Sequence, residues 1–235
     1  SNTIIFAHIY FNMENLLSNL KITVPEKIYI KDPETSDLGR RILEHSIQLI
    51  DEIGLEAFTF KKLGQKIGSN ESSIYRYFES KHNLLLYLTS WYWAWLEYQL
   101  VLETYGMSRP EDKLKKAIEI VTRRVKQDVS YTFINEVILY RIIVNESSKS
   151  FLTKEVDLEN KEGYFVAYKR IITRLKDMIS AVDPNYSHPT SLASTIMEGA
   201  LHKQILRDHF NSITDCDKEI TPNIFFDNLV FKVLS

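Results

Sequence analysis

Residues 59–80 bring three helix-capping side chains close together, and this spacing constrains the fold more than any other feature of the sequence. Thr59, Asn70 and Ser80 can each accept a hydrogen bond from the free N–H groups at the start of a helix. Gly68 suits the left-handed conformation that ends many helices. The pattern predicts two short helices joined by a tight turn, with a third helix directly after them. Paired short helices with glycine in the turn are typical of the helix-turn-helix motif.

A longer helix is predicted before this pair. Any of residues 35–37 can cap its start, and Leu43, Ile47 and Ile50 recur on one face. Gly54 is suited to its end. Together the segments predict a bundle of three helices, with the last helix of the motif covering residues 70–78.

The rest of the chain also reads as helical. Seven glycines and six prolines in 235 residues are few for the many turns of an all-β protein. We predict a long helix from Lys81 to about Gly106, and further helices at 110–128, 131–147, 157–181, 189–209 and 222–234. The fold class is therefore all-α, with an N-terminal arm at 1–36, a helix-turn-helix domain at 37–84 and a C-terminal helical domain at 85–235.

Composition excludes several other classes of protein. Cys216 is the only cysteine, so an internal disulfide and a cysteine-based zinc site are ruled out, and a reducing cytoplasm is expected. The most apolar long stretch, residues 84–102, is interrupted by polar side chains and does not read as a membrane span. The six histidines lack metal-ligand spacing, and the sequence shows no phosphate loop and no nucleophile elbow. We expect no enzyme activity, no metal and no cofactor.

The segment around the predicted motif resembles a known family. The matching residues are 40–44 (RRILE), 54–59 (GLEAFT), Leu63, Gly68, 73–78 (SIYRYF) and 80–81 (SK). Over about residues 38–88, roughly a fifth of the chain, they resemble the DNA-binding domain of the tetracycline-repressor (TetR) family. This resemblance implies a dimeric transcription regulator that binds double-stranded operator DNA.

The start of the predicted recognition helix has the side chains that a major groove requires. Asn70, Ser72 and Ser73 are short and polar, so the helix can approach base edges closely. Lys61 and Lys62 lie in the first turn of the preceding helix, where free N–H groups and the helix dipole favour an anion. The family resemblance assigns base contacts to Ser72, Ser73 and Arg76. It assigns phosphate contacts to Thr59, Lys61, Tyr75, Tyr77 and Lys81.

Overall charge gives this interpretation little support. The formal net charge is −2, and residues 36–84 contain seven basic and seven acidic side chains. A neutral domain predicts modest affinity for DNA from one subunit, so binding to two half-sites by a homodimer is expected. An alternative that the neutral domain favours is a helical protein-interaction module that has lost DNA binding.

The predicted C-terminal domain contains candidates for an effector site and a dimer interface. The resemblance implies that the helix from Lys81 adjoins a cavity for a small-molecule effector. The candidate lining residues are Trp91, Trp95, Tyr98, Tyr131, Tyr140 and Tyr168, with core packing as the alternative role of these aromatic side chains. Small residues of helix 189–209 (Ala193, Ser194, Gly199 and Ala200) allow close helix packing, either between two subunits, as the resemblance implies, or within one. The predicted function is a repressor that an effector releases from a palindromic operator.

Overall fold

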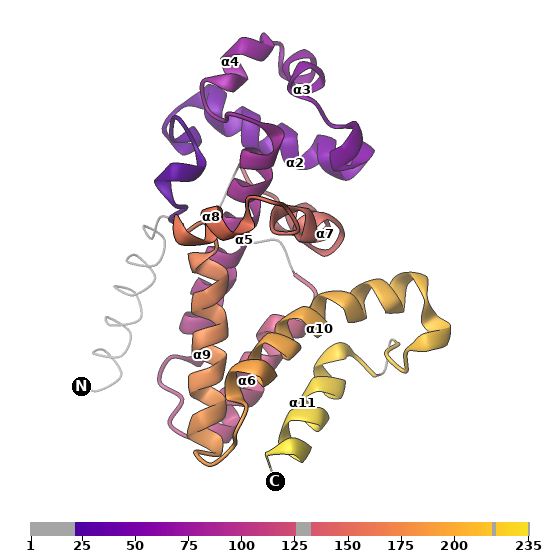
Figure 1. The fold of residues 1–235 in the computed structure, drawn as a ribbon. Coiled ribbons are helices and arrows are strands. Elements are labelled where there is room, and N and C mark those ends of the chain that lie inside the picture. The colour runs from indigo at the N-terminus through magenta and orange to yellow at the C-terminus, as the bar shows by residue number, and fades with distance from the viewer. Residues whose placement is uncertain (1–21, 126–132, 218–219, 235) are drawn as a thin grey trace, which may run out of the picture.

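The computed structural model describes residues 22–125, 133–217 and 220–234, and every regular element in these ranges is a helix (Figure 1). The N-terminal part contains η1 (Glu26–Ile28), η2 (Pro33–Thr35), α2 (Asp37–Ala57), α3 (Phe60–Ile67) and α4 (Glu71–Tyr75). The C-terminal part contains α5 (Lys81–Thr104), α6 (Pro110–Thr122), α7 (Glu136–Glu146), η3 (Ser147–Ser150), α8 (Val156–Lys161), α9 (Val166–Val182), α10 (Pro189–His209), η4 (Asn211–Ile213) and α11 (Pro222–Val233). The all-α prediction is confirmed.

The predicted caps set the helix boundaries of the N-terminal part. The side chains of Ser36, Thr59, Asn70 and Ser80 each accept a hydrogen bond from the backbone N–H three residues later. Each cap satisfies a donor that the start of a helix otherwise leaves without a partner. The positions of α2, α3, α4 and α5 therefore follow from local chemistry.

The described end of the N-terminal arm packs onto this domain. Ile22, Val24 and Ile28 are buried. The Ile30 N–H donates to the Tyr77 carbonyl at 2.8 Å. Residues 22–36 thus contribute to the same core as α2–α5, although their sequence has no helical period.

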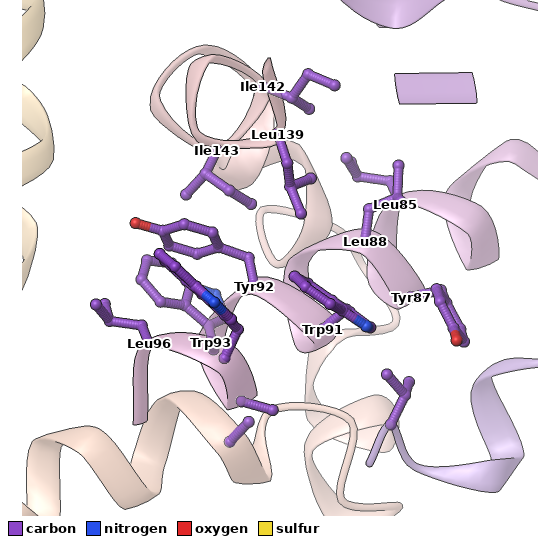
Figure 2. Close-up of a cluster of buried hydrophobic side chains, with 14 of the residues drawn as sticks. Leu85, Tyr87, Leu88, Trp91, Tyr92, Trp93, Leu96, Leu139, Ile142 and Ile143 are labelled. Atoms are coloured by element: carbon purple, nitrogen blue, oxygen red, sulfur yellow. The ribbon is translucent and has the colours of Figure 1, made fainter. Parts of the chain in front are cut away.

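Helix α5 runs from the N-terminal domain through the C-terminal domain (Figure 1). Every residue from Leu84 to Glu97 is buried, so α5 has no solvent-facing side over this stretch. A helix that is apolar all round must be covered on all sides, and α6, α7, α9, η1 and η3 all contact it. Figure 2 shows Leu139 and Ile143 of α7 facing the aromatic side chains of α5.

Three predicted C-terminal helices differ from the structure. The helix predicted at 131–147 begins only at Glu136, as α7. The segment 157–181 is not one helix, because Gly163 takes a φ of 88° between α8 and α9. Helix α6 ends at Thr122, where Arg123 is extended, and not at residue 128. The turn at Gly163 places Tyr164 so that its carbonyl accepts from the Ser90 hydroxyl of α5 at 3.1 Å.

A buried carboxylate fastens α9 to α5. Glu97 is buried, and its two oxygens accept from Arg170 at 2.6 Å and from Arg174 at 2.8 Å. A buried carboxylate is costly unless it is paired and hydrogen-bonded. Both requirements are met here, so the polar group fixes how the two helices align.

We predict that Trp91→Ala destabilises the protein strongly. Trp91 is fully buried in the core, and truncating a buried tryptophan costs about 3–5 kcal/mol of unfolding free energy. Urea unfolding followed by circular dichroism measures the change. Tyr105→Ala is the control: Tyr105 is 71% exposed, so its free energy of unfolding should stay within about 0.5 kcal/mol of the parent. Equal losses in the two variants would contradict the central role of α5.

Candidate nucleic-acid interface

Helices α3 and α4 form a tight helix-turn-helix. Gly68 ends α3 in the left-handed conformation (φ 64°, ψ 37°), and Asn70 caps α4 two residues later. Gly64 faces the turn so closely that an added Cβ would lie 2.7 Å from the Ser69 carbonyl oxygen. The motif therefore needs glycine at 64 for close approach and benefits from glycine at 68 for backbone conformation. The sequence analysis did not identify the role of Gly64.

Asn70 organises the polar start of α4. Its Oδ1 accepts hydrogen bonds from the Ser73 N–H at 2.9 Å, the Ser72 hydroxyl at 2.9 Å and the Ser73 hydroxyl at 2.6 Å. Because both hydroxyl protons point to Asn70, the serine lone pairs remain available as acceptors. Ser72 is exposed and Ser73 half-buried. Asn70 thus acts mainly by orienting its neighbours.

Helix α4 is shorter than predicted. It covers Glu71–Tyr75, and Arg76 forms its C-cap, whereas the predicted range was 70–78. Phe78 lies outside the helix and is fully buried in the core. The exposed surface of α4 is therefore limited to its first turn, Tyr75 and the adjacent Arg76.

The structure separates the two predicted tyrosines. Tyr75 is 47% exposed, and its ring packs edge-on against Phe60 of α3 with centroids 5.0 Å apart. Tyr77 is only 4% exposed, and its hydroxyl forms a 2.8 Å hydrogen bond with the Ser36 hydroxyl. The prediction of a Tyr77 phosphate contact is therefore withdrawn, because this side chain joins the arm and α2 to the core. Tyr75 keeps the surface position that a phosphate contact needs.

The lysines in and near the helix-turn-helix have different ion-pair and hydrogen-bond partners. Lys66 is paired with Glu52 at 2.9 Å. The Lys81 ammonium donates to the carbonyls of Leu55 and Glu56 at 3.0 and 3.2 Å. Lys81 therefore caps the C-terminal end of α2, where a cation also complements the helix dipole.

Lys61, Lys62 and Arg76 are exposed cations of the helix-turn-helix segment. Lys62 donates to the Ala57 carbonyl at 2.8 Å. Neither Lys61 nor Arg76 forms an ion pair with any residue in the described ranges, and both are exposed, as is Thr59 beside them. Their charges are thus available to an external anion.

The aromatic candidates for an effector site have different environments. Trp91 and Trp95 are buried in the core. Tyr98 is half-buried, and Tyr131 lies outside the described residues. Tyr168 packs against Trp93 with ring centroids 5.1 Å apart. Burial raises the pKa of Tyr168 to about 12, so its hydroxyl is protonated at neutral pH.

Tyr140 is the candidate that lines a pocket. This pocket lies between α7 and α10 and has a volume of about 240 Å³. A second pocket of about 320 Å³ lies where the end of α2 meets η3, and it includes Leu55, Lys81 and Lys149. The sequence analysis located neither pocket, because each is formed by segments far apart in the chain.

A metal site and a membrane span are both absent from the described residues. They contain no group of histidine, cysteine and acidic side chains arranged to hold a metal ion. None of the helices in the described ranges combines the length and apolar character that a membrane span needs. The helix-turn-helix remains the site that sequence and geometry support together.

The comparisons with known proteins agree with this site. Residues 42–88 match the family model of bacterial regulatory proteins, tetR family. The N-terminal domain belongs to the TetR family. The match runs from α2 across α3 and α4 into α5, and so includes the whole helix-turn-helix. No curated protein matches the sequence.

Solved structures share the overall fold at low sequence identity. AibR, solved in complex with isovaleryl coenzyme A and operator DNA, has a TM-score of 0.53 at 18% identity, covering 83% of this chain and 98% of that one. The superantigen PfiT has a TM-score of 0.59 at 14% identity, covering 87% and 99%. The ketosteroid transcriptional regulator KstR2 of Mycobacterium tuberculosis has a TM-score of 0.51 at 15% identity, covering 83% and 93%. At these identities the likeness shows the fold alone.

We predict that Gly64→Ala weakens the helix-turn-helix. The added methyl group meets the Ser69 carbonyl, and such overpacking costs about 1–3 kcal/mol of unfolding free energy. Gly68→Asn is the matched control, because no atom lies within 4 Å of its added Cβ and asparagine tolerates positive φ. Chemical denaturation compares the two variants. A Gly68→Asn variant less stable than Gly64→Ala would refute the close-approach argument.

Proposed function

We propose that this protein binds a palindromic operator as a homodimer and represses transcription until a small-molecule effector releases it. The observation that carries the proposal is the exposed first turn of α4, whose serine acceptors lie beside the unpaired cations Lys61 and Arg76. Such a turn has the shape and chemistry for a major groove, with phosphate contacts on its flanks.

Each exposed residue has a proposed role on DNA. Ser72, Ser73 and Arg76 read base edges, since arginine pairs with guanine and serine accepts from or donates to several bases. Phosphate contacts come from the surrounding side chains: Thr59, Lys61, Lys62, Asn70, Tyr75 and Lys81. Lys81 reaches a phosphate only by giving up its hydrogen bonds to the end of α2.

The exposed face of α11 supports a homodimer. Four apolar side chains of this helix are more than a third exposed: Ile224, Phe225, Leu229 and Val233. Phe225, Leu229 and Val233 recur every four residues and so share one face of α11, and an exposed apolar stripe of this kind is typical of an interaction surface. The small residues of α10 serve packing inside the subunit instead, because Ala193 and Ala200 are buried and an added Cβ at Gly199 would meet Phe226 of α11 at 2.6 Å. We therefore place the dimer contact on α11.

The effector acts through the C-terminal domain in this proposal. AibR was solved with an acyl coenzyme A and operator DNA, which supports ligand control of a fold of this type. The buried Trp95 indole N–H has no hydrogen-bond acceptor among the described residues, so a ligand acceptor would satisfy it. Ligand binding would shift α5, which begins at the helix-turn-helix, and change the separation of the two recognition helices.

We predict that Lys61→Gln lowers the salt dependence of duplex binding. Loss of one phosphate contact per subunit should reduce the slope of log K against log salt by about 1.8 for a dimer. Fluorescence anisotropy with genomically selected fragments, titrated at several salt concentrations, gives this slope. Lys66→Gln is the control, since Lys66 already pairs with Glu52, and its slope should match the parent.

Two outcomes would contradict this part of the proposal. Equal slopes for the parent and Lys61→Gln would remove Lys61 from the interface. No binding to duplex DNA even at low salt would favour the protein-interaction module, an alternative suggested by the neutral domain.

We predict that Leu229→Glu converts the dimer to a monomer. A charge in the middle of the apolar face of α11 would be left without a partner in the interface, and burying it is unfavourable. Sedimentation velocity at micromolar protein measures the mass. Leu158→Glu, on the exposed surface of α8, is the control and should remain dimeric. If Leu229→Glu stays dimeric as well, the interface lies elsewhere.

A further inference from the structure

The pocket between α7 and α10 has both apolar and charged side chains in its lining. Val125, Val137, Val144 and Ile205 provide the apolar lining, and Arg124, Arg141, Asp208 and His209 provide the charge. Two arginines and one aspartate leave an excess of one positive charge in this lining when His209 is neutral. Because the Asp51 carboxylate balances this charge from outside the lining, a monoanion with an apolar chain matches the pocket when it takes the place of Asp51.

Arg141 lines this pocket and also takes part in the contact between α2 and α7, which we call the joint between the domains. Its Nε donates to Asp51 Oδ1 at 2.8 Å and its Nη2 to Asp51 Oδ2 at 2.5 Å. Asp51 is on α2, the first helix of the DNA-binding domain. The same guanidinium therefore lines the pocket and holds α2 against α7.

Two further contacts complete this joint. Glu146 of α7 accepts from the Leu55 N–H at 3.2 Å, directly after the backbone break at Gly54. Lys149 forms a 3.0 Å ion pair with Glu56. The Lys149 ammonium is also the main reason that the pKa of the Glu56 carboxyl is lowered. The last turn of α2 is thus held by charged contacts from α7 and η3.

The polar groups inside the pocket suit a carboxylate. Arg124 lines the pocket and forms a 2.7 Å ion pair with Asp208. Burial raises the pKa of Tyr140 to about 12, so its hydroxyl keeps the proton that it would donate. Planar guanidinium groups bind carboxylates through paired hydrogen bonds. A carboxylate in the pocket would therefore compete with Asp51 for Arg141.

We propose that the pocket binds a short-chain aliphatic carboxylate, whose head group takes Arg141 from Asp51 and so releases α2 from α7. The chain of the ligand lies against the valines and Ile205. The consequence for operator binding rests on the function proposed above, whereas the competition between ligand and Asp51 does not.

Isothermal titration calorimetry of the full chain with hexanoate tests the site without DNA. Asp51→Asn removes the competitor, so hexanoate should bind about twofold to fivefold more tightly, the range for a partly exposed ion pair. Arg141→Met removes the ligand contact and should weaken binding at least about tenfold, as expected for loss of a charged hydrogen bond. Lys149→Met breaks the same joint away from the pocket and should bind hexanoate like the parent.

Two further probes define the class of ligand. Hexan-1-ol lacks the charge and inorganic phosphate lacks the chain, so both should bind more weakly than hexanoate. Phosphate binding as tightly as hexanoate would exclude a role for the apolar wall. The proposal is overturned if hexanoate does not bind the parent, if Arg141→Met binds it normally, or if Asp51→Asn leaves its affinity unchanged.

Duplex binding then separates this proposal from the proposed function. Hexanoate should weaken duplex binding by the parent and have no effect on Arg141→Met. A protein whose hexanoate affinity responds to Asp51→Asn and Arg141→Met as expected, but which does not bind duplex DNA, would disprove the proposed function alone. A protein that binds duplex DNA, but whose hexanoate affinity does not respond to these substitutions, would disprove the pocket proposal alone.

Discussion

Burial of α5 on all sides is the constraint on which the rest of the structure depends. From Leu84 to Glu97 the helix has no face suited to water, so other elements must surround it. The N-terminal domain covers its first turns and the C-terminal helices cover the rest. Because one rigid helix serves both domains, the helix-turn-helix cannot move freely relative to the C-terminal core. Only residues 76–80 connect α4 to α5, so this short segment restricts changes in the angle between the helix-turn-helix and α5.

A second connection between the domains is of a different physical kind. Asp51, Leu55 and Glu56 of α2 meet charged side chains of α7 and η3. Partly exposed ion pairs contribute about 0–1 kcal/mol each, so a competing ion can replace them. The apolar packing of α5 has no such competitor. The ion pairs between α2 and α7–η3 are therefore easier to exchange than the apolar packing of α5.

The sequence predicted what local chemistry controls and missed what distant partners control. Thr59, Asn70 and Ser80 act as caps through their own backbone neighbours, so their roles were predicted correctly. Tyr77 was assigned a phosphate contact from the family resemblance, but its hydroxyl bonds to Ser36, which is 41 residues away. Arg141 gave no signal, since its carboxylate partner is 90 residues distant. The break at Gly163 was missed because apolar residues recur with helical spacing on both sides of it.

Local pairing also determines which cations of the neutral domain remain without an ion-pair partner. Lys66 is neutralised by Glu52, and Lys81 is occupied by the carbonyls at the end of α2. Only a few unpaired cations are left beside the first turn of α4, so one subunit can make few phosphate contacts and its affinity must be modest. Binding strength then depends on two recognition surfaces engaging at a fixed separation. In the proposed homodimer, that separation depends on the subunit contact on α11 and on the angle between α2 and α7. In the proposed mechanism, an exchange of partners at Arg141 changes this angle, and so the affinity for DNA, while the residues that touch DNA stay the same.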